Sequence, residues 1–160
     1  MTDQAASHPA DHAGVRLPPP LIYVVLFGIG LALHQVVPLT FLPVIPARIV
    51  ALVFLSAGVL LIAWSNVLFR QAHTSLVPIK PATALVIAGP YRLTRNPMYL
   101  GLLCVYIALA LWFGVVWALA LAPLVVLAVQ RLAIAKEERY LEQKFGDAYR
   151  QYRAQVRRWI

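Results

Sequence analysis

Four long apolar stretches take up most of this chain and constrain its fold more than any other feature. They cover about residues 21–37, 45–69, 98–113 and 115–135. A helix needs about 20 residues to cross the hydrocarbon core of a bilayer, so the second and fourth stretches are long enough and the other two are marginal. The hydrophobic content of 61% lies well above the roughly 45–50% of soluble domains. We therefore expect an all-α fold, an integral membrane bundle of four transmembrane helices.

The remaining segments predict how this bundle is organised. Residues 1–20 carry two acids and end in three consecutive prolines, a composition typical of a disordered tail. We assign residues 21–160 to a single membrane domain, because the chain is too short for a second domain. Aromatic and leucine residues recur at helical spacing after Lys136. They predict an amphipathic helix over about residues 136–158 that lies against the membrane face.

Small and aromatic residues within the apolar stretches predict how the helices pack. Gly114 and its neighbours are all that separates the third and fourth stretches. These two stretches must therefore form a tight antiparallel hairpin, with Trp112 and Trp117 as anchors at the membrane interface. In the first stretch we expect Gly28 and Gly30 to make packing contacts between helices.

Basic residues gather at the ends of the apolar stretches and predict the orientation of the chain. The loop of residues 70–95 contains four of them and the tail from Lys136 seven, whereas the connections at 38–46 and at Gly114 contain none. Because cytoplasmic loops are enriched in lysine and arginine, we expect both termini and the long loop to be cytoplasmic. The net charge of +8 therefore follows membrane topology, and without a recognised motif it does not predict nucleic-acid binding. With Cys104 as the single cysteine, we also expect no metal site.

A polar, doubly basic motif leads into the third apolar stretch. Residues 89–101 read GPYRLTRNPMYLG, with Arg92 and Arg95 lying between two tyrosines. Anchoring at a basic membrane face explains arginine and tyrosine. It does not explain the Gly-Pro and Asn-Pro pairs, which shape the backbone at two points. Gly101, one turn into the helix, permits close approach of a ligand or of a neighbouring helix. The motif therefore predicts a polar site at one face of the bilayer.

The acidic residues of the membrane domain are confined to one short segment. All of them lie between Glu137 and Asp147, directly after the fourth apolar stretch. Arg131 and Glu138 share one helical face by their spacing, and an arginine at the lipid boundary normally has a partner. A snorkelling Arg131 paired with a glutamate is the purely structural alternative. The concentration of acid on an otherwise basic face suits a cationic or polyhydroxylated ligand.

In their order and spacing, the two polar segments resemble the isoprenylcysteine carboxyl methyltransferase and phospholipid methyltransferase superfamily. That family carries an Arg-His-Pro-x-Tyr-x-Gly pattern and a downstream Glu-Glu pair. The matching residues are Arg95, Pro97, Tyr99, Gly101, Glu137 and Glu138. The tail pattern FGxxYxxY that begins at Phe145 is also similar, and the resemblance covers about residues 75–158. Asn96 stands where eukaryotic members have His, so an acid–base role of that His cannot be transferred.

The resemblance implies S-adenosylmethionine as cofactor, held at the cytoplasmic end of the last two helices. Candidate cofactor-binding residues are Val86, Gly89, Pro90, Tyr91, Arg95, Pro97, Tyr99, Gly101, Glu137 and Glu138. Of the two glutamates, Glu138 is favoured as the partner of the ribose hydroxyls or the amino group. Candidate catalytic residues are Arg95, Asn96, Tyr99 and Arg131. The chain has no glycine-rich Rossmann signature, so a cofactor site of the soluble type is not expected.

The same resemblance implies a membrane-embedded methyltransferase of a bacterial inner membrane, whose partners are an amphiphilic acceptor and membrane lipids. A carboxylate acceptor of the isoprenylcysteine type is favoured, because an ionised nucleophile needs no strong general base and depends mainly on positioning. Methylation of a phospholipid amine or of a small thiol is the first alternative. A non-catalytic lipid-binding or scaffold protein is the alternative of another class. The sequence leaves the oligomeric state open.

Overall fold

The computed structural model describes residues 18–40, 43–74 and 82–160, and every regular element within these ranges is helical. In chain order the elements are α1 (Pro19–Val36), α2 (Val44–Gln71), the 3₁₀ turn η1 (Gly89–Arg92), α3 (Pro97–Phe113), α4 (Val116–Val129), the π-helical segment η2 (Gln130–Ile134), α5 (Ala135–Phe145) and α6 (Asp147–Gln155). The predicted N-terminal tail lies outside the described residues up to residue 17. Its last residues belong to α1, because Pro19 already begins that helix.

Among the described residues, three helical segments are long and apolar enough to cross a membrane, namely α1, α2 and the continuous helix from Val116 to Phe145. α3 is also apolar but has 17 residues, which is about 26 Å of helix against a hydrocarbon core of about 30 Å. Large apolar side chains cover the outer face of α2, such as Val53 at 64% exposure and Leu60 at 67%. Such a surface is suited to lipid. The chain is therefore an integral membrane protein, and the fourth span stays a prediction.

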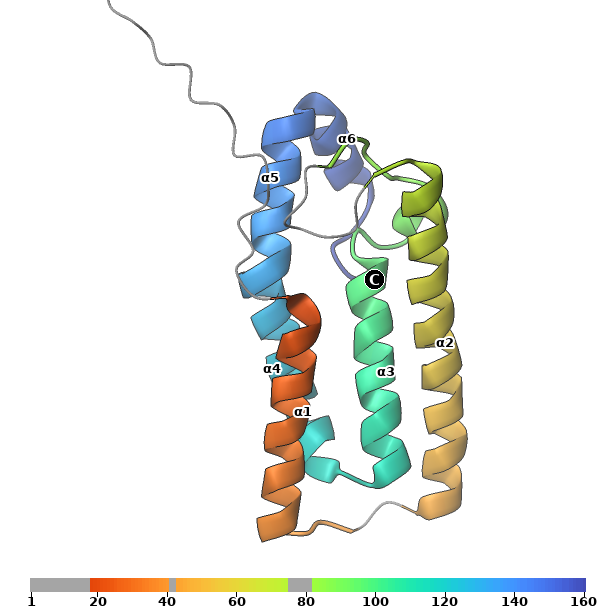
Figure 1. Cartoon of the computed structure of the whole chain (residues 1–160), viewed down its shortest axis with the longest axis vertical. Coiled ribbons are helices and arrows are strands. Elements are labelled where there is room, and N and C mark those ends of the chain that lie inside the picture. The colour runs from red at the N-terminus through yellow and green to blue at the C-terminus, as the bar shows by residue number, and fades with distance from the viewer. Residues whose placement is uncertain (1–17, 41–42, 75–81) are drawn as a thin grey trace, which may run out of the picture.

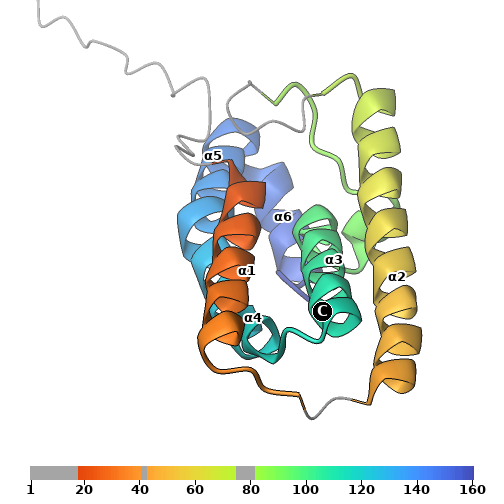
Figure 2. The same cartoon turned by 60° about the horizontal axis from the view of Figure 1, so that its bottom comes forward.

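The four apolar helices run along one common axis and pack as neighbouring pairs (Figure 1). α2 packs along α3, α1 packs against α4, and α3 contacts both α4 and α1. The turned view shows α2 on one outer side, α3 in the middle, and α1 with α4 on the other side (Figure 2). The core lies where α1, α3 and α4 meet. At its centre, the buried Tyr106 hydroxyl donates a hydrogen bond to the Ala118 carbonyl oxygen at 2.9 Å.

Glycines allow the paired helices to approach closely. A Cβ added to Gly30 would lie 2.8 Å from the Ala118 backbone, so α1 and α4 touch at this point as the sequence predicts. A Cβ added to Gly58 would lie 2.7 Å from the Gly101 carbonyl oxygen, and one added to Gly101 would lie 2.9 Å from the Gly58 carbonyl oxygen. Small residues at such reciprocal contacts let backbones pack directly in a membrane. Gly28, in contrast, has nothing within 4 Å of an added Cβ.

α3 and α4 form the predicted tight hairpin. Gly114 adopts a φ of 67°, a left-handed conformation that glycine reaches without steric cost. Near this turn, the Trp117 indole N–H donates to the Val37 carbonyl oxygen at 2.8 Å. The Arg48 guanidinium lies 5.3 Å from the centroid of the Trp112 ring. Both tryptophans therefore fix the end of the bundle at which the sequence predicts interfacial anchors.

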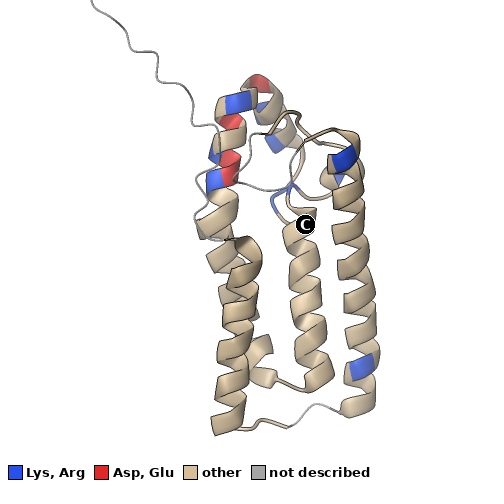
Figure 3. Ribbon diagram, in the orientation of Figure 1, with Lys and Arg blue, Asp and Glu red and all other residues tan. Residues whose placement is uncertain are grey.

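Most charged residues of the described chain gather at the other end of the bundle (Figure 3). This charged end consists of the last turn of α2, the start of α3, and the two helices α5 and α6. Arg48 is an exception, and it lies near the start of α2 beside the Trp112 ring. The apolar length of the helices thus separates a charged end from a nearly uncharged one, which is the pattern behind the predicted orientation.

The C-terminal region differs from the single helix predicted over residues 136–158. α5 continues the membrane helix without a break, and the chain then turns at Gly146, where φ is 52°. α6 folds back over the start of α3 (Figure 1). Its inner face is buried within the protein, since Tyr149 is 1% exposed and Tyr152 8%. The prediction of a single helix over residues 136–158 is therefore wrong, because the chain reverses at Gly146 and these aromatic residues pack on the charged end.

The contact between α2 and α3 predicts how Gly58→Ala changes stability. The added methyl group has no room against the Gly101 backbone, and overpacking of this kind costs about 1–3 kcal/mol. Gly28→Ala is the matched control, because it gives the same gain in helix propensity without a clash. We expect unfolding by SDS in mixed micelles to begin earlier for Gly58→Ala than for Gly28→Ala. Equal transitions would show that the two helices do not touch at these glycines.

Candidate functional site

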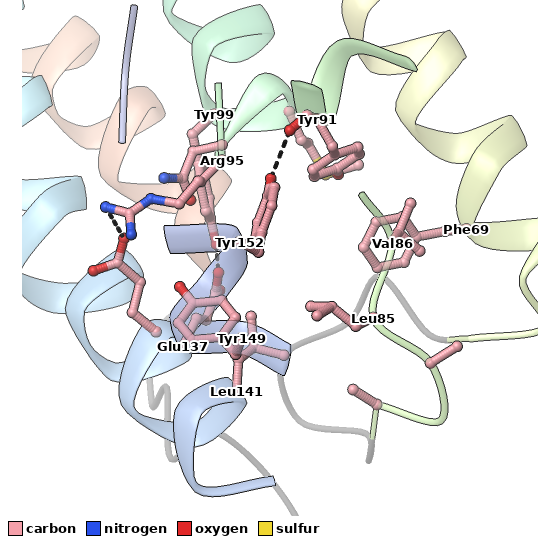
Figure 4. Close-up of a pocket in the computed structure, with 15 residues that line it drawn as sticks. Phe69, Leu85, Val86, Tyr91, Arg95, Tyr99, Glu137, Leu141, Tyr149 and Tyr152 are labelled. Atoms are coloured by element: carbon pink, nitrogen blue, oxygen red, sulfur yellow. Dashed lines mark hydrogen bonds and ion pairs between the residues drawn. The ribbon is translucent and has the colours of Figure 1, made fainter. Parts of the chain in front are cut away.

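A cavity at the charged end brings most of the predicted site residues together (Figure 4). From the predicted set, its wall contains Val86, Tyr91, Arg95, Asn96, Tyr99, Glu137 and Glu138. The wall is built by the end of α2, the loop before η1, the start of α3, α5 and α6. A concave, largely apolar wall with a few convergent polar groups is typical of a small-molecule site.

Apart from Val86, sequence reasoning misses the apolar part of this wall. The additional residues are Phe69, Ala82, Ala84, Leu85, Met98, Leu141, Tyr149 and Tyr152. Figure 4 shows Phe69, Leu85 and Val86 across the cavity from Leu141 and Tyr149. The FGxxYxxY pattern of the tail contains Tyr149 and Tyr152, so the sequence does offer a signal for these two residues of the wall. Phe69 has no such signal, because in the sequence it looks like any other apolar residue of a membrane helix.

Two turns fix the backbone that presents the polar side chains. Gly89 has a φ of 59°, and a Cβ at this position would lie 2.9 Å from Leu68 Cδ1, so another residue there would be strained. Pro90 and Pro97 are fully buried, and Pro97 begins α3. None of these three predicted cofactor residues belongs to the described cavity wall. Their positions indicate that they shape the loop.

Tyr99 connects α3 to two neighbouring helices. Its hydroxyl donates a hydrogen bond to the Glu137 carboxylate. Its backbone carbonyl oxygen accepts a hydrogen bond from the Tyr23 hydroxyl at 2.9 Å. Tyr99 is 8% exposed, so these contacts hold both the ring and the Glu137 carboxylate in place on the cavity wall.

Glu138 is held by two arginines from distant parts of the chain. Its Oε1 lies 3.1 Å from Arg95 Nη2 and 3.1 Å from Arg158 Nε, and its Oε2 lies 2.5 Å from Arg158 Nη2. The Glu138 side chain is 9% exposed, and charge-assisted pairs of this kind are strong hydrogen bonds. Because both carboxylate oxygens are already engaged, this geometry favours Glu137 over Glu138 as a cofactor ligand, contrary to the preference drawn from the sequence.

Arg95 carries hydrogen-bond donors that the described part of the chain does not satisfy. Its side chain is 9% exposed, and among the described residues its Nε and Nη1 are buried without a hydrogen-bond partner. An unpaired buried donor costs about 1–3 kcal/mol, and a charged donor costs more. A guanidinium in this state on a cavity wall is suited to binding an anion, and its planar geometry matches a carboxylate.

The tyrosines of α6 contribute neutral aromatic surface. Burial raises the pKa of Tyr149 to about 12, and burial likewise raises the pKa of Tyr152. Both phenols are therefore protonated at physiological pH and do not serve as general bases. The Tyr152 hydroxyl donates to the Tyr91 carbonyl oxygen at 2.7 Å, and the Tyr91 ring centroid lies 5.6 Å from that of Phe69. These contacts join α6, η1 and α2 into one aromatic wall.

Two other predicted site residues lie away from the cavity. Gly101 faces Gly58 of α2 in the helix contact described above. Arg131 lies in η2 and is exposed. Its predicted position on the Glu138 face assumes a regular α-helix, but a π-helical segment places an extra residue in the turn and shifts the register. The structure therefore does not bring Arg131 to the site.

Comparison with known proteins identifies a family. The family model described as phospholipid methyltransferase matches residues 46–148, more than half of the chain. The chain belongs to the phospholipid methyltransferase family. It is also 46% identical to an uncharacterized protein of Haemophilus influenzae over 63 residues, which are 39% of this chain and 100% of that protein. No solved structure shows significant similarity to the chain.

Membership of the phospholipid methyltransferase family confirms the resemblance that the two motifs indicate. The match covers α2, the loop, α3, α4 and α5, which are the elements that supply the polar side chains of the cavity. Because this is a family of methyltransferases, the match supports a methyltransferase activity at a membrane. It ends within α6, before Arg158, the residue near the C-terminus that binds Glu138.

The buried contact between Tyr99 and Glu137 predicts the effect of Tyr99→Phe. This change leaves a carboxylate without its donor, and we expect the folded state to lose about 1–3 kcal/mol. Tyr106→Phe is the matched control, because it deprives an uncharged backbone oxygen of a hydrogen bond. We therefore expect a smaller loss for Tyr106→Phe when unfolding is followed in mixed micelles. Wild-type stability of Tyr99→Phe would contradict the assigned hydrogen bond.

Proposed function

We propose that this protein is an S-adenosylmethionine-dependent methyltransferase that holds its cofactor in the cavity at the charged end. The supporting observation is Arg95, a residue of the cavity wall whose buried Nε and Nη1 have no hydrogen-bond partner among the described residues. The other groups of the wall complement the remaining parts of this cofactor. The Glu137 carboxylate can accept hydrogen bonds from an amino group or ribose hydroxyls, and the wall of Tyr91 and Phe69 suits an adenine ring.

Two polar residues of the wall complement the charges of the cofactor. Arg95 offers N–H groups to the cofactor's carboxylate, and Glu137 offers an acceptor to its ammonium group or hydroxyls. When bound, the cofactor supplies an activated methyl group on a sulfonium sulfur. The chain itself excludes water and holds the reacting groups in line, and positioning of this kind is worth about 7–11 kcal/mol in favourable cases.

An amphiphilic acceptor is the substrate class that this architecture supports. An apolar groove between α1 and α3 is lined by Tyr23, Phe27, Leu102 and Tyr106 among others. Its Tyr23 is hydrogen-bonded to Tyr99 of the cofactor cavity, so an apolar chain in the groove would lie beside the site. An acceptor carboxylate, as in isoprenylcysteine, suits this site because it is already ionised and needs no base. The tyrosines of the described wall are neutral phenols and would not act as a base. Membrane lipids are the other partners that we propose.

A phospholipid amine is the second candidate acceptor, and the description of the matching family favours it. An amine must lose a proton before it attacks, so the site would need a base. Glu137 is the candidate for this base, because its carboxylate hydrogen-bonds to the neutral Tyr99 hydroxyl, whereas Glu138 is engaged by two arginines. For both acceptors we propose that the charged end faces the cytoplasm of a bacterial inner membrane, from which the soluble cofactor enters.

Cofactor binding tests the proposal directly. We expect purified protein in detergent to bind S-adenosylhomocysteine by calorimetry, and Arg95→Gln to weaken binding by about tenfold or more through loss of a charge-assisted contact. Arg150→Gln is the matched control, because its ion pair with Asp147 is exposed and away from the cavity. A wild-type protein that does not bind this ligand would favour a non-catalytic lipid-binding or scaffold protein.

A separate experiment distinguishes the acceptors. A membrane lipid extract is incubated with the enzyme and isotopically labelled S-adenosylmethionine, and labelled products are identified by mass spectrometry. A carboxylate acceptor yields a methyl ester that mild base hydrolyses. A phospholipid amine yields a methylated headgroup that survives the same treatment. The expected product is the ester, and a base-stable label in the lipid headgroup would replace the carboxylate with the amine.

A further inference from the structure

The residues that follow α6 return to the motif at the start of α3. The Arg95 backbone N–H donates to the Arg157 carbonyl oxygen at 2.9 Å. The Thr94 hydroxyl and the Asn96 side-chain amide both donate to the Arg158 carbonyl oxygen at 3.0 Å. Figure 1 shows the C-terminus beside the start of α3. Three successive motif residues therefore bind two successive residues near the C-terminus.

A side-chain contact anchors the end of this segment to the bundle. The Trp159 indole N–H donates to Gln130 Oε1 at 3.1 Å, and the ring packs against the core cluster. Together with the backbone contacts, this holds the preceding residue, Arg158, in a defined position beside α5. Its side chain is 31% exposed, and it does not belong to the described wall of the cavity. Any effect of Arg158 on the site must therefore pass through another residue.

Arg158 binds Glu138 more completely than Arg95 does. Its Nε and Nη2 reach both carboxylate oxygens, at 3.1 and 2.5 Å. Arg95 reaches one oxygen through Nη2 at 3.1 Å. Hydrogen bonding to Glu138 also raises the pKa of Arg158, so this guanidinium stays charged. Glu138 therefore forms its bidentate ion pair with Arg158, a residue that does not belong to the described cavity wall.

The geometry of arginine–carboxylate pairs predicts how Arg95 would respond to the loss of Arg158. A carboxylate that faces a single guanidinium favours a bidentate pair, in which two N–H groups of the arginine are consumed. Without Arg158, the buried Glu138 would have Arg95 as its remaining ionic partner. Arg95 would then turn a second N–H group toward Glu138 and have fewer donors for a ligand.

We propose that Arg158 is a positioning residue of the cofactor site, which occupies Glu138 so that Arg95 keeps Nε and Nη1 for the carboxylate of the cofactor. This inference rests on the proposed function. It assigns a role in ligand recognition to a residue close to the C-terminus that lies beyond the part of the chain matched by the family model.

Two ligands separate this role from general support of the fold. S-Adenosylhomocysteine carries the carboxylate, and 5′-methylthioadenosine contains the nucleoside and the sulfur but no carboxylate. We expect Arg158→Gln to weaken binding of S-adenosylhomocysteine by about tenfold, and to leave binding of methylthioadenosine within about twofold of wild type. Calorimetry in detergent measures both. Arg150→Gln, which removes an exposed ion pair on α6, should change neither.

Arg158→Lys provides a second variant, because it keeps the charge but loses the fork that binds both oxygens. We expect its loss for S-adenosylhomocysteine to lie between wild type and Arg158→Gln, again without an effect on methylthioadenosine. Equal losses for both ligands would overturn the positioning role in favour of a structural one. Unchanged binding of both ligands by the two variants would also overturn it. A wild-type protein that does not bind S-adenosylhomocysteine would overturn the proposed function itself.

Discussion

A charged side chain in hydrocarbon or in a closed cavity needs a partner, and this constraint organises the whole molecule. The apolar helices hold their charges at their ends, where Arg48 lies against the Trp112 ring at one end and most other charges lie at the opposite end. At that charged end, burial forces arginines and acids into contact. The cluster of Arg95, Glu138 and Arg158 is the result. Arg158 supplies two of the three donors that bind Glu138, and Arg95 keeps two nitrogens without a hydrogen-bond partner among the described residues.

Two local irregularities turn a simple hairpin into a site. The π-helical segment η2 changes the register between the membrane part of the last long helix and its acidic continuation. Glu138 is consequently buried, while Arg131, which precedes it by seven positions, is exposed. Gly146 then reverses the chain, so that α6 covers the start of α3. Neither feature adds a functional side chain, but both determine which side chains meet.

These irregularities also explain which features the sequence predicts and which it does not. Apolar length, the Gly114 turn and the two polar motifs are local patterns, and the structure contains each of them. The direction of α6 depends on packing of Tyr149 and Tyr152, and the role of Arg158 depends on contacts across 62–64 residues of chain. Gly101 illustrates the same limit. The sequence predicts that something can approach this glycine closely, but it does not say whether a ligand or α2 does so. The sequence therefore predicts the chemistry of the site better than it predicts which residues form the site.

Asn96 shows how the chemistry follows from these contacts. Its backbone N–H donates to the Thr94 hydroxyl and its side-chain amide donates to the Arg158 carbonyl oxygen. An amide does not titrate in the physiological range, so Asn96 ties the motif to the C-terminal segment and neither takes up nor releases a proton. The neighbouring phenols of Tyr149 and Tyr152 are held neutral by burial, and Glu138 is engaged by arginines. Among these groups, Glu137 alone lacks an ionic partner on the described wall, so it is the proton acceptor that this wall offers to a reaction. A nucleophile that arrives already ionised, as we propose for the acceptor carboxylate, releases no proton.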